Sequence, residues 1–263
     1  MLPILDESYR PSSHWVQDLA QKYDALHQFE PIASTPASRI QEHLYVEQVT
    51  ENLLLGDLKI TRERVRELIN GISLPANNQA EQAALSFANA VRYLHTLIAN
   101  QENKVSFNLT SDLLCELHTL AMEELGEGGG CFRTSEAKPL AEGHQPADAE
   151  ALSLLIDNAL EWFSVPSFQE LHPVEQAWLV HLRLMDLQPF AQANGRLVRL
   201  ATSLYTLRAG LLPIIVSAND REFYHFALVN SFQMITQPGI ELFARSLMHT
   251  YDEVLKFVKT TDN

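Results

Sequence analysis

The chain is poor in cysteine, in positive charge and in long apolar runs. Its 263 residues include only two cysteines, Cys115 and Cys131, whose spacing matches no zinc or redox motif. The 19 Lys and Arg against 33 Asp and Glu give a net charge of −14. Because nucleic-acid surfaces need clustered positive charge, we expect no nucleic-acid partner, although one small basic pocket for a nucleotide is compatible with this balance. No apolar run reaches the length of a membrane span and no secretion signal is present, so we expect a cytoplasmic protein without a membrane partner.

Segments that alternate apolar and polar residues with a period of two are also few and short. Apolar residues recur instead at helical spacing, for example over residues 80–100, 111–125 and 240–258. Hydrophobic residues make up 46% of the chain, enough for a sizeable core. We predict an all-α fold, with an N-terminal arm and helices over residues 1–55 and a helical domain over residues 56–263, together one continuous globular unit. The oligomeric state does not follow from the sequence.

Two stretches interrupt the helical pattern. The first, residues 126–144, holds half of the chain's 10 glycines together with Pro139 and cannot be one continuous helix. It is either a disordered loop or a shaped loop with a short hairpin. The second is "LQPFAQANGRLVRL", residues 187–200. Because loops carry function more often than the helices they join, both stretches are candidate sites.

The second stretch has the features of an anion site at a helix start. Pro189 predicts that the preceding helix ends near Leu187, because the residue before proline avoids the helical region. Asn194 is a suitable N-cap for the next helix, and Gly195 allows the backbone to approach a ligand closely. The free N–H groups and the dipole of that helix favour an anion in the loop.

Two arginines strengthen this interpretation. Arg196 and Arg199 lie on one face of the first turns of the predicted helix. Positive side chains oppose the helix dipole there, unless an anion such as phosphate lies between them. The alternative is an ordinary Asn-Gly turn before a helix with two solvated arginines.

The stretch and its surroundings resemble the Fic family, whose signature is His-Pro-Phe-x-(Asp/Glu)-Gly-Asn-Gly-Arg-x-x-Arg. The segment "GCFRTSEAKPLAEGHQP" resembles the family's flap, and "AGLLPIIVSANDREFYHFAL" resembles the segment after the motif; the likeness runs from about Asp57 to about Phe232. It implies a Fic-type helical bundle, a short β-hairpin flap near the loop and a nucleotide pocket. The signature positions that match are Pro189, Phe190, Asn194, Gly195, Arg196 and Arg199.

Members of this family mostly transfer AMP from ATP to a protein hydroxyl, and three groups needed for that chemistry are replaced here. Gln188 stands in place of the catalytic histidine, and its amide cannot act as a general base near neutral pH. Gln192 replaces the acidic ligand of Mg²⁺, so Mg²⁺ is doubtful and we predict no metal site. Ala193 replaces the first glycine, and its Cβ penalises a turn of positive φ by roughly 1 kcal/mol or more.

The resemblance implies that ATP or another nucleotide binds to the residues that remain. Arg133 either contacts the phosphates or pins the flap, and Tyr224 either lines the adenine pocket or belongs to the core. The resemblance also allows a protein target or an extended peptide at the flap. The implied nucleotide- or phosphate-binding residues are Phe190, Gln192, Ala193, Asn194, Gly195, Arg196, Arg199, Arg133 and Tyr224.

Many relatives carry an inhibitory helix, (Ser/Thr)-x-x-x-Glu-(Gly/Asn), whose glutamate occupies the second motif arginine. The corresponding stretch is "EQVTENLLLGDLKITRERV". In one register Leu55 replaces the glutamate and Glu51 replaces the Ser or Thr, so the inhibitory motif is lost. In a shifted register Glu51 and Asn52 form the Glu-Asn pair, and Glu47 replaces the Ser or Thr.

Two histidines are candidates to replace the missing base. His181 lies two helical turns before Gln188, about 10.5 Å by helix rise, and is expected to be packed or capping. His144 closes the flap region and either faces the pocket or is an exposed loop histidine.

Three functions fit the sequence. The first is a degenerate Fic protein that binds a nucleotide or another phosphate-containing ligand, with AMP transfer weak or absent. The second is an active transferase that works without the motif histidine, by positioning and by charge stabilisation from Arg196 and Arg199. The third is a structural helical protein whose pocket is vestigial.

Overall fold

The computed structural model describes residues 14–261 except 31, 33, 73–75, 105–106 and 127–128. Every regular element in these residues is a helix, so the predicted all-α fold is confirmed. Two short 3-10 helices, η2 (Glu123–Leu125) and η3 (Ala218–Asp220), join longer ones. The α-helices are α1 (His14–His27), α2 (Ser34–Leu55), α3 (Arg62–Ile69), α4 (Gln79–Ala99), α5 (Ser111–Met122), α6 (Leu152–Trp162), α7 (Pro166–Gln169), α8 (Pro173–Leu187), α9 (Asn194–Arg208), α10 (Arg221–Phe232) and α11 (Gln237–Thr261).

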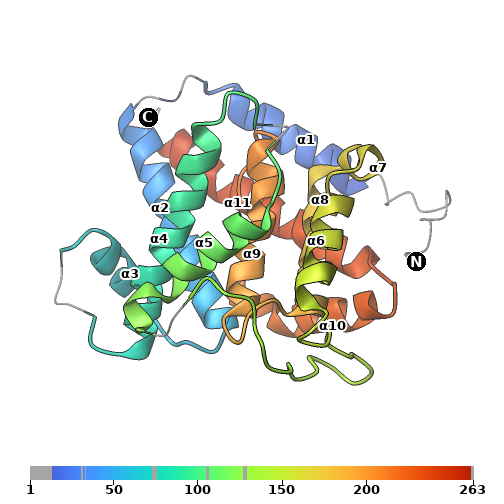
Figure 1. Ribbon diagram of the computed structural model, residues 1–263. Helices are drawn as coiled ribbons and strands as arrows, with labels where there is room; N and C mark the ends of the chain where they lie inside the picture. The colour runs from blue at the N-terminus through green and yellow to red at the C-terminus, as the bar shows by residue number, and fades with distance from the viewer. Residues whose placement is uncertain are drawn as a thin grey trace.

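Helix α9 lies at the centre of the bundle. In Figure 1 it stands between α4 and α5 on one side and α6 and α8 on the other, and it packs against α2, α4, α5 and α8. Its side chains from Leu197 to Thr206 are all buried, as expected for a helix surrounded by others. From Leu197 onward, the side chains of this helix therefore point into protein rather than into solvent.

Helix α8 delivers the chain to the loop before α9. Pro173 occupies its first position, where proline is favoured. The His172 ring accepts the N–H of Val174, and the Glu175 carboxylate accepts the N–H of His172, so the two side chains cap this end. The helix ends at Leu187, where Pro189 predicted its end.

The N-terminal helices are part of the same bundle. Helix α1 packs along α11, and α2 packs against α3, α4, α9 and α11 (Figure 1). The boundary predicted at residues 55 and 56 stays a prediction. What matters for the site is that α2 brings its last turns to the first turns of α9.

The flap contains no strand in its described residues, 129–144, so the predicted β-hairpin is not confirmed. Two of its backbone N–H groups are bound from outside the flap or by a side chain: the N–H of Arg133 donates to the Pro189 carbonyl at 2.9 Å, and the N–H of Leu140 donates to the His144 ring at 3.0 Å. These bonds use groups that a hairpin ladder would need.

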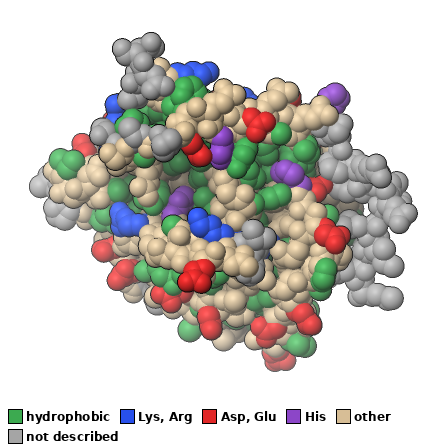
Figure 2. Space-filling model, turned by 90° about the horizontal axis from the view of Figure 1, so that it is seen from above, with side chains coloured by type: hydrophobic (Ala, Val, Ile, Leu, Met, Phe, Trp, Pro, Cys, Tyr) green, Lys and Arg blue, Asp and Glu red, His purple; other side chains and the backbone are tan. Residues whose placement is uncertain are grey.

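The excess of acidic over basic residues is visible on the surface. On the face shown in Figure 2, acidic side chains gather along the lower edge, whereas Lys and Arg side chains are few and scattered. Within the described residues, no helix is both long and apolar enough to span a membrane.

Candidate functional site

The loop between α8 and α9 has a residue in the left-handed backbone conformation at each end. Gln188 caps α8 with φ 44, and its N–H donates to the Leu184 carbonyl at 2.9 Å. Ala193 has φ 64 and precedes the first residue of α9. Ala193 therefore adopts a positive φ although it is not glycine, at a cost of about 1 kcal/mol.

Asn194 holds the loop rather than capping α9. The expected N-cap position belongs to Ala193, and Asn194 is the first helical residue. Its Oδ1 accepts the Phe190 N–H at 2.9 Å, and its Nδ2 donates to the Phe190 carbonyl at 2.6 Å. Because an amide offers both an acceptor and a donor, it can satisfy both backbone groups of one residue. Asn194 thus closes the loop on itself.

Arg133 pins the flap to the end of α8. The side chain is buried, and its guanidinium donates to the carbonyls of Gln188 at 2.8 Å and Leu187 at 3.1 Å. The same guanidinium also donates to the carbonyl of Ser135 in the flap, at 2.8 Å, and to that of Ala147 just after it, at 2.6 Å. A cation at these last carbonyls also complements the helix dipole. Of its two expected roles, the geometry supports pinning.

The Gln188 side chain points toward the flap. It is buried, and its Nε2 donates to the Lys138 carbonyl at 2.7 Å. The amide is held in place, but it has no proton equilibrium near neutral pH with which to act as a general base.

His118, on α5, joins the loop to the flap and was not found from the sequence. Its ring stacks on Phe190, with centroids 3.9 Å apart and planes 10° from parallel. Nδ1 accepts the Gly130 N–H at 2.9 Å, so the ring proton is on Nε2, which donates to the Gln192 carbonyl at 3.3 Å. Burial lowers the pKa of His118 to about 4, the charge of Arg196 acts in the same direction, and the bond to Gln192 opposes both. The ring is therefore neutral at pH 7.

Arg199 is buried, not solvated, and all its hydrogen-bond partners are neutral. Nε donates to Asn52 Oδ1 at 2.7 Å, Nη2 to the Asn52 carbonyl at 3.1 Å and Nη1 to the Tyr224 hydroxyl at 3.4 Å. A Cβ built on Gly195 would lie 3.2 Å from Nη1, so the guanidinium reaches back to the first turn of α9. In the described residues no carboxylate pairs with this charge.

Arg196 lies on the same helix end and reaches toward α5. It is half-buried, and its Nη2 approaches Met122 Sδ at 3.2 Å. The structure thus places both motif arginines at the start of α9, one over α5 and one toward α2.

Tyr224 belongs to the core beside Arg199. It is 4% exposed, and its hydroxyl lies 2.9 Å from His181 Nε2. Burial lowers the pKa of His181 well below 6.5, and the charge of Arg199 lowers it further. His181 is therefore a packed, neutral ring, as expected.

His144 is buried and its lone pair is occupied. Nδ1 accepts the Leu140 N–H at 3.0 Å, so the proton is on Nε2, which lies 3.3 Å from the Asp186 carbonyl and 3.4 Å from Asp186 Oδ1. The ring stacks on Phe232 with centroids 4.2 Å apart. It is neither an exposed loop histidine nor, in this arrangement, a base facing the pocket.

Helix α2 contacts the second motif arginine through an amide. Asn52 bonds to Arg199, whereas Glu51 accepts the Ala218 N–H and pairs with Arg62. Leu55, at the glutamate position in the unshifted register, is a buried apolar residue one turn further on. Neither register places a carboxylate on Arg199 in this structure.

The loop does not fit Mg²⁺. Residues 188–199 contain no Asp or Glu, and the nearby Asp186 carboxylate is paired with Arg183 at 2.7 Å. Mg²⁺ prefers carboxylate and phosphate oxygens in octahedral geometry. Among the described residues, no group of three or more His, Cys, Asp or Glu is arranged to hold a metal ion.

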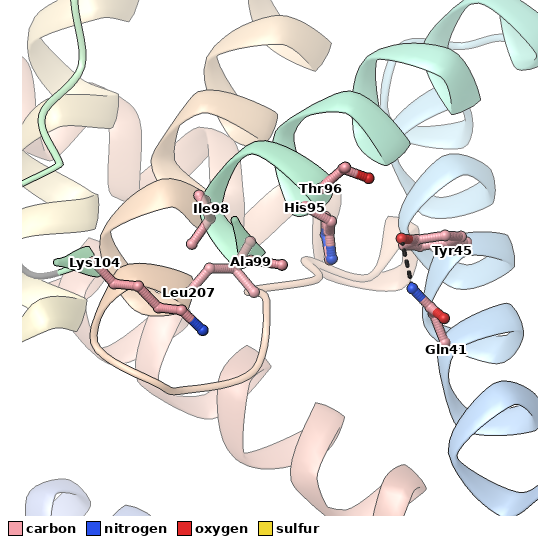
Figure 3. Close-up of a pocket in the computed structure, with 8 residues that line it drawn as sticks. All are labelled: Gln41, Tyr45, His95, Thr96, Ile98, Ala99, Lys104 and Leu207. Carbon is pink, nitrogen blue, oxygen red and sulfur yellow. Dashed lines mark hydrogen bonds between the residues drawn. The ribbon is translucent and has the colours of Figure 1, made fainter. Parts of the chain in front are cut away.

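A cavity of about 330 Å³ lies elsewhere, between α2 and α4. Figure 3 shows Lys104 and Leu207 at one end of it and Gln41 and Tyr45 at the other. Leu207 is 13 residues after Asn194 on α9, so the cavity is about 20 Å along the helix axis from the loop. It is not part of the candidate site.

The fold, the loop between α8 and α9 and the flap pinned to it together match one class of protein. Residues 108–206 match the model described as the Fic/DOC family. The Fic-1 fragment from C. elegans superposes with a TM-score of 0.81 at 19% identity, covering 95% of this chain and 74% of that one. Residues 108–206 are thus similar to the Fic/DOC family, and the helical fold is that of solved Fic domains.

Curated relatives share this similarity over much of the chain. A protein named protein adenylyltransferase Fic from Aedes aegypti is 24% identical over 241 residues, 89% of this chain and 46% of that protein. The chain spans about half the length of the curated relatives it matches. IbpAFic2, solved covalently tethered to Cdc42, is 17% identical with a TM-score of 0.52, covering 92% of this chain and 72% of that one.

Proposed function

We propose that the loop over residues 188–199 binds a nucleotide or another phosphate-containing ligand, and that AMP transfer to protein hydroxyls is weak or absent. The observation that carries the proposal is Arg199: a buried cation whose hydrogen-bond partners are all neutral, beside the N-terminus of α9. A buried charge is costly unless it is paired, and both the guanidinium and the helix start attract an anion.

The weak transfer follows from the groups that the loop has lost. Gln188 supplies no general base, His118 and His144 have their acceptor nitrogens occupied, and no carboxylate in the loop orients a metal. General-base catalysis alone contributes about 10²- to 10⁴-fold in typical enzymes. The relatives' names support a nucleotide as the ligand and a protein as the partner, and the flap is the surface we expect that partner to meet.

The alternative is an active transferase in which Arg196 and Arg199 stabilise charge without the motif histidine. Transfer from ATP labelled in its α-phosphate separates the two, if a cell extract supplies the hydroxyl-bearing proteins. We expect no label above that of the Arg196→Ala variant. Arg196-dependent labelling would establish the alternative instead.

Titration of ATP into Arg196→Ala tests the binding site itself. We expect at least about tenfold weaker binding than wild type, a change of about 1.4 kcal/mol. Arg92→Ala is the matched control, because it removes the same charge from an exposed position on α4. Equal affinities for wild type, Arg196→Ala and Arg92→Ala would refute the proposed site.

A further inference from the structure

The flap segment before Cys131 lies in direct contact with helix α5. A Cβ built on Gly129 would lie 2.8 Å from Thr119 Cα and 2.9 Å from the His118 carbonyl. A Cβ built on Gly130 would lie 2.3 Å from Thr119 Oγ1 and 3.4 Å from the Cys115 carbonyl. Only residues without a side chain approach a helix this closely.

The contacts also show the direction in which the segment runs. Gly129 meets the helix at residues 118–122, and Gly130 meets it at residues 115–119. Both glycines contact Thr119, and Gly130 also approaches the Cys115 carbonyl, one turn nearer to the N-terminus of α5. Cys131 is the next residue, one Cα step of about 3.8 Å further. The chain thus arrives at the turn of α5 that carries Cys115.

The electrostatics agree with this placement. Burial raises the pKa of the Cys115 thiol, and negative charge on Cys131 and on Asp112 raises it further. Because charge interactions fall off with distance, this effect agrees with a placement of both sulfur atoms on the same side of α5. Both cysteines are free thiols, and the chain has no others.

We propose that Cys115 and Cys131 are a redox-sensitive pair, which a peroxide oxidises to a reversible intramolecular disulfide between helix α5 and the flap. The inference rests on the two contacts of the glycines with α5, and it goes beyond the proposed function because it needs no nucleotide. A disulfide joins Cα atoms 4.4–6.8 Å apart, so the bond requires that the flap bring Cys131 within that separation of Cys115.

The exposure of the two thiols sets the order of the reaction. Cys131 is exposed and Cys115 is half-buried, so the Cys131 thiol loses its proton and its thiolate attacks the peroxide. An S–O bond forms and the O–O bond breaks, which gives a sulfenic acid and a hydroxide that takes up the released proton to become water. The Cys115 thiol then loses its proton as its sulfur attacks the Cys131 sulfur, and the S–O bond breaks to release a second water. In total, two thiols and one H₂O₂ give one disulfide and two waters, and two electrons pass from sulfur to peroxide.

The disulfide restricts the loop that we propose as the anion site. Cys131 is two residues before Arg133, which holds the carbonyls of Gln188 and Leu187. On its other side, Gly130 is bonded to His118, which holds Gln192. A covalent tie at Cys131 therefore fixes both connections between the flap and the loop.

Peptide mapping of the oxidised native protein tests the pair. The reduced chain is treated with a small molar excess of H₂O₂, alkylated with iodoacetamide and digested without reduction. We expect a cross-linked peptide that contains Cys115 and Cys131, from protein that runs as single chains on a denaturing non-reducing gel, and its loss on treatment with dithiothreitol. We also expect slower hydrogen exchange over residues 129–135 and 188–193 in the oxidised form.

Two variants and an unfolded control complete the experiment. Cys115→Ser and Cys131→Ser each leave one thiol, so neither should form the cross-link. The pair is refuted if the native chain keeps both thiols, or forms only dimers or sulfinic acid, while the urea-unfolded chain oxidises readily. Nucleotide binding is not a readout, so failure of the anion site leaves this test intact.

Discussion

Asn52→Asp is the substitution that most directly probes the Arg199 charge. It keeps the shape of the side chain and places a carboxylate oxygen where Asn52 Oδ1 now accepts from Arg199 Nε at 2.7 Å. Two opposite charges about 4 Å apart attract by about 4 kcal/mol at an effective dielectric constant of 20. Against this, Asn52 Nδ2 now donates to the Gln48 carbonyl at 2.8 Å, and losing that bond costs about 1 kcal/mol.

The net result is a guanidinium that is already paired. Arg199 then attracts a phosphate less strongly. We expect ATP to bind at least about tenfold more weakly, a loss of about 1.4 kcal/mol of binding free energy. Calorimetric titration measures the affinity, and thermal unfolding checks that the variant is folded. Asn52→Ala is the control, because it removes the amide without adding charge and should keep the ATP affinity within about threefold, or about 0.65 kcal/mol. A folded Asn52→Asp variant that binds ATP as tightly as wild type would refute the reasoning.

Three further predictions concern packing, pH and chemistry. Gly239→Ala should lower the free energy of unfolding by roughly 1–3 kcal/mol, because its Cβ would lie 1.8 Å from the buried Trp178 ring; denaturant titration measures it. Between pH 6.5 and about 4, the wild-type protein should take up about one proton on unfolding at His118, because the pKa of His118 is lowered to about 4 in the folded state. The His118→Phe variant should take up about one proton fewer than wild type. Gln188→His combined with Gln192→Asp should raise AMP transfer from labelled ATP, if only the lost groups limit it.

Each of these has a control within the chain. Gly56→Ala is matched to Gly239→Ala, because a Cβ at Gly56 meets nothing closer than 3.5 Å; equal losses in both variants would contradict the packing argument. For His118, a folded ring with a depressed pKa means that stability is present above pH 6.5 and is lost as pH falls toward 4, so an unchanged pH dependence in the phenylalanine variant contradicts the assignment. A folded double variant that binds ATP without transferring label would show that more than two groups are missing.

Local features of the fold and loop followed from the sequence because neighbouring residues decide them. Helical periodicity predicted the bundle, and Pro189 predicted the end of α8 at Leu187. The penalty at Ala193 followed from its residue type, but only the structure shows that this alanine nevertheless adopts a positive φ. The assignment of Asn194 as an N-cap was wrong. An amide near a helix start can either cap the helix or bind the preceding loop, and only the fold shows that both amide groups bind Phe190.

Contacts between distant segments could not be predicted. His118 meets the loop across 72 residues, and Arg199 meets Asn52 across 147 residues. No local motif marks His118 or Asn52 as a partner. Whether a residue on a helix faces a distant loop depends on how the helices pack, and the adjacent sequence does not show it. The same holds for Cys115 and Cys131, whose spacing matches no redox motif and whose proposed pairing rests on the contacts of the flap with α5.

The central claim is that the loop binds phosphate through Arg196, Arg199 and the start of α9, without a metal. Calorimetric titration of ATP into the wild-type chain, once with Mg²⁺ and once with a chelator, tests it most directly. The account predicts binding with the same affinity in both titrations. No binding, or binding that requires Mg²⁺, would contradict it.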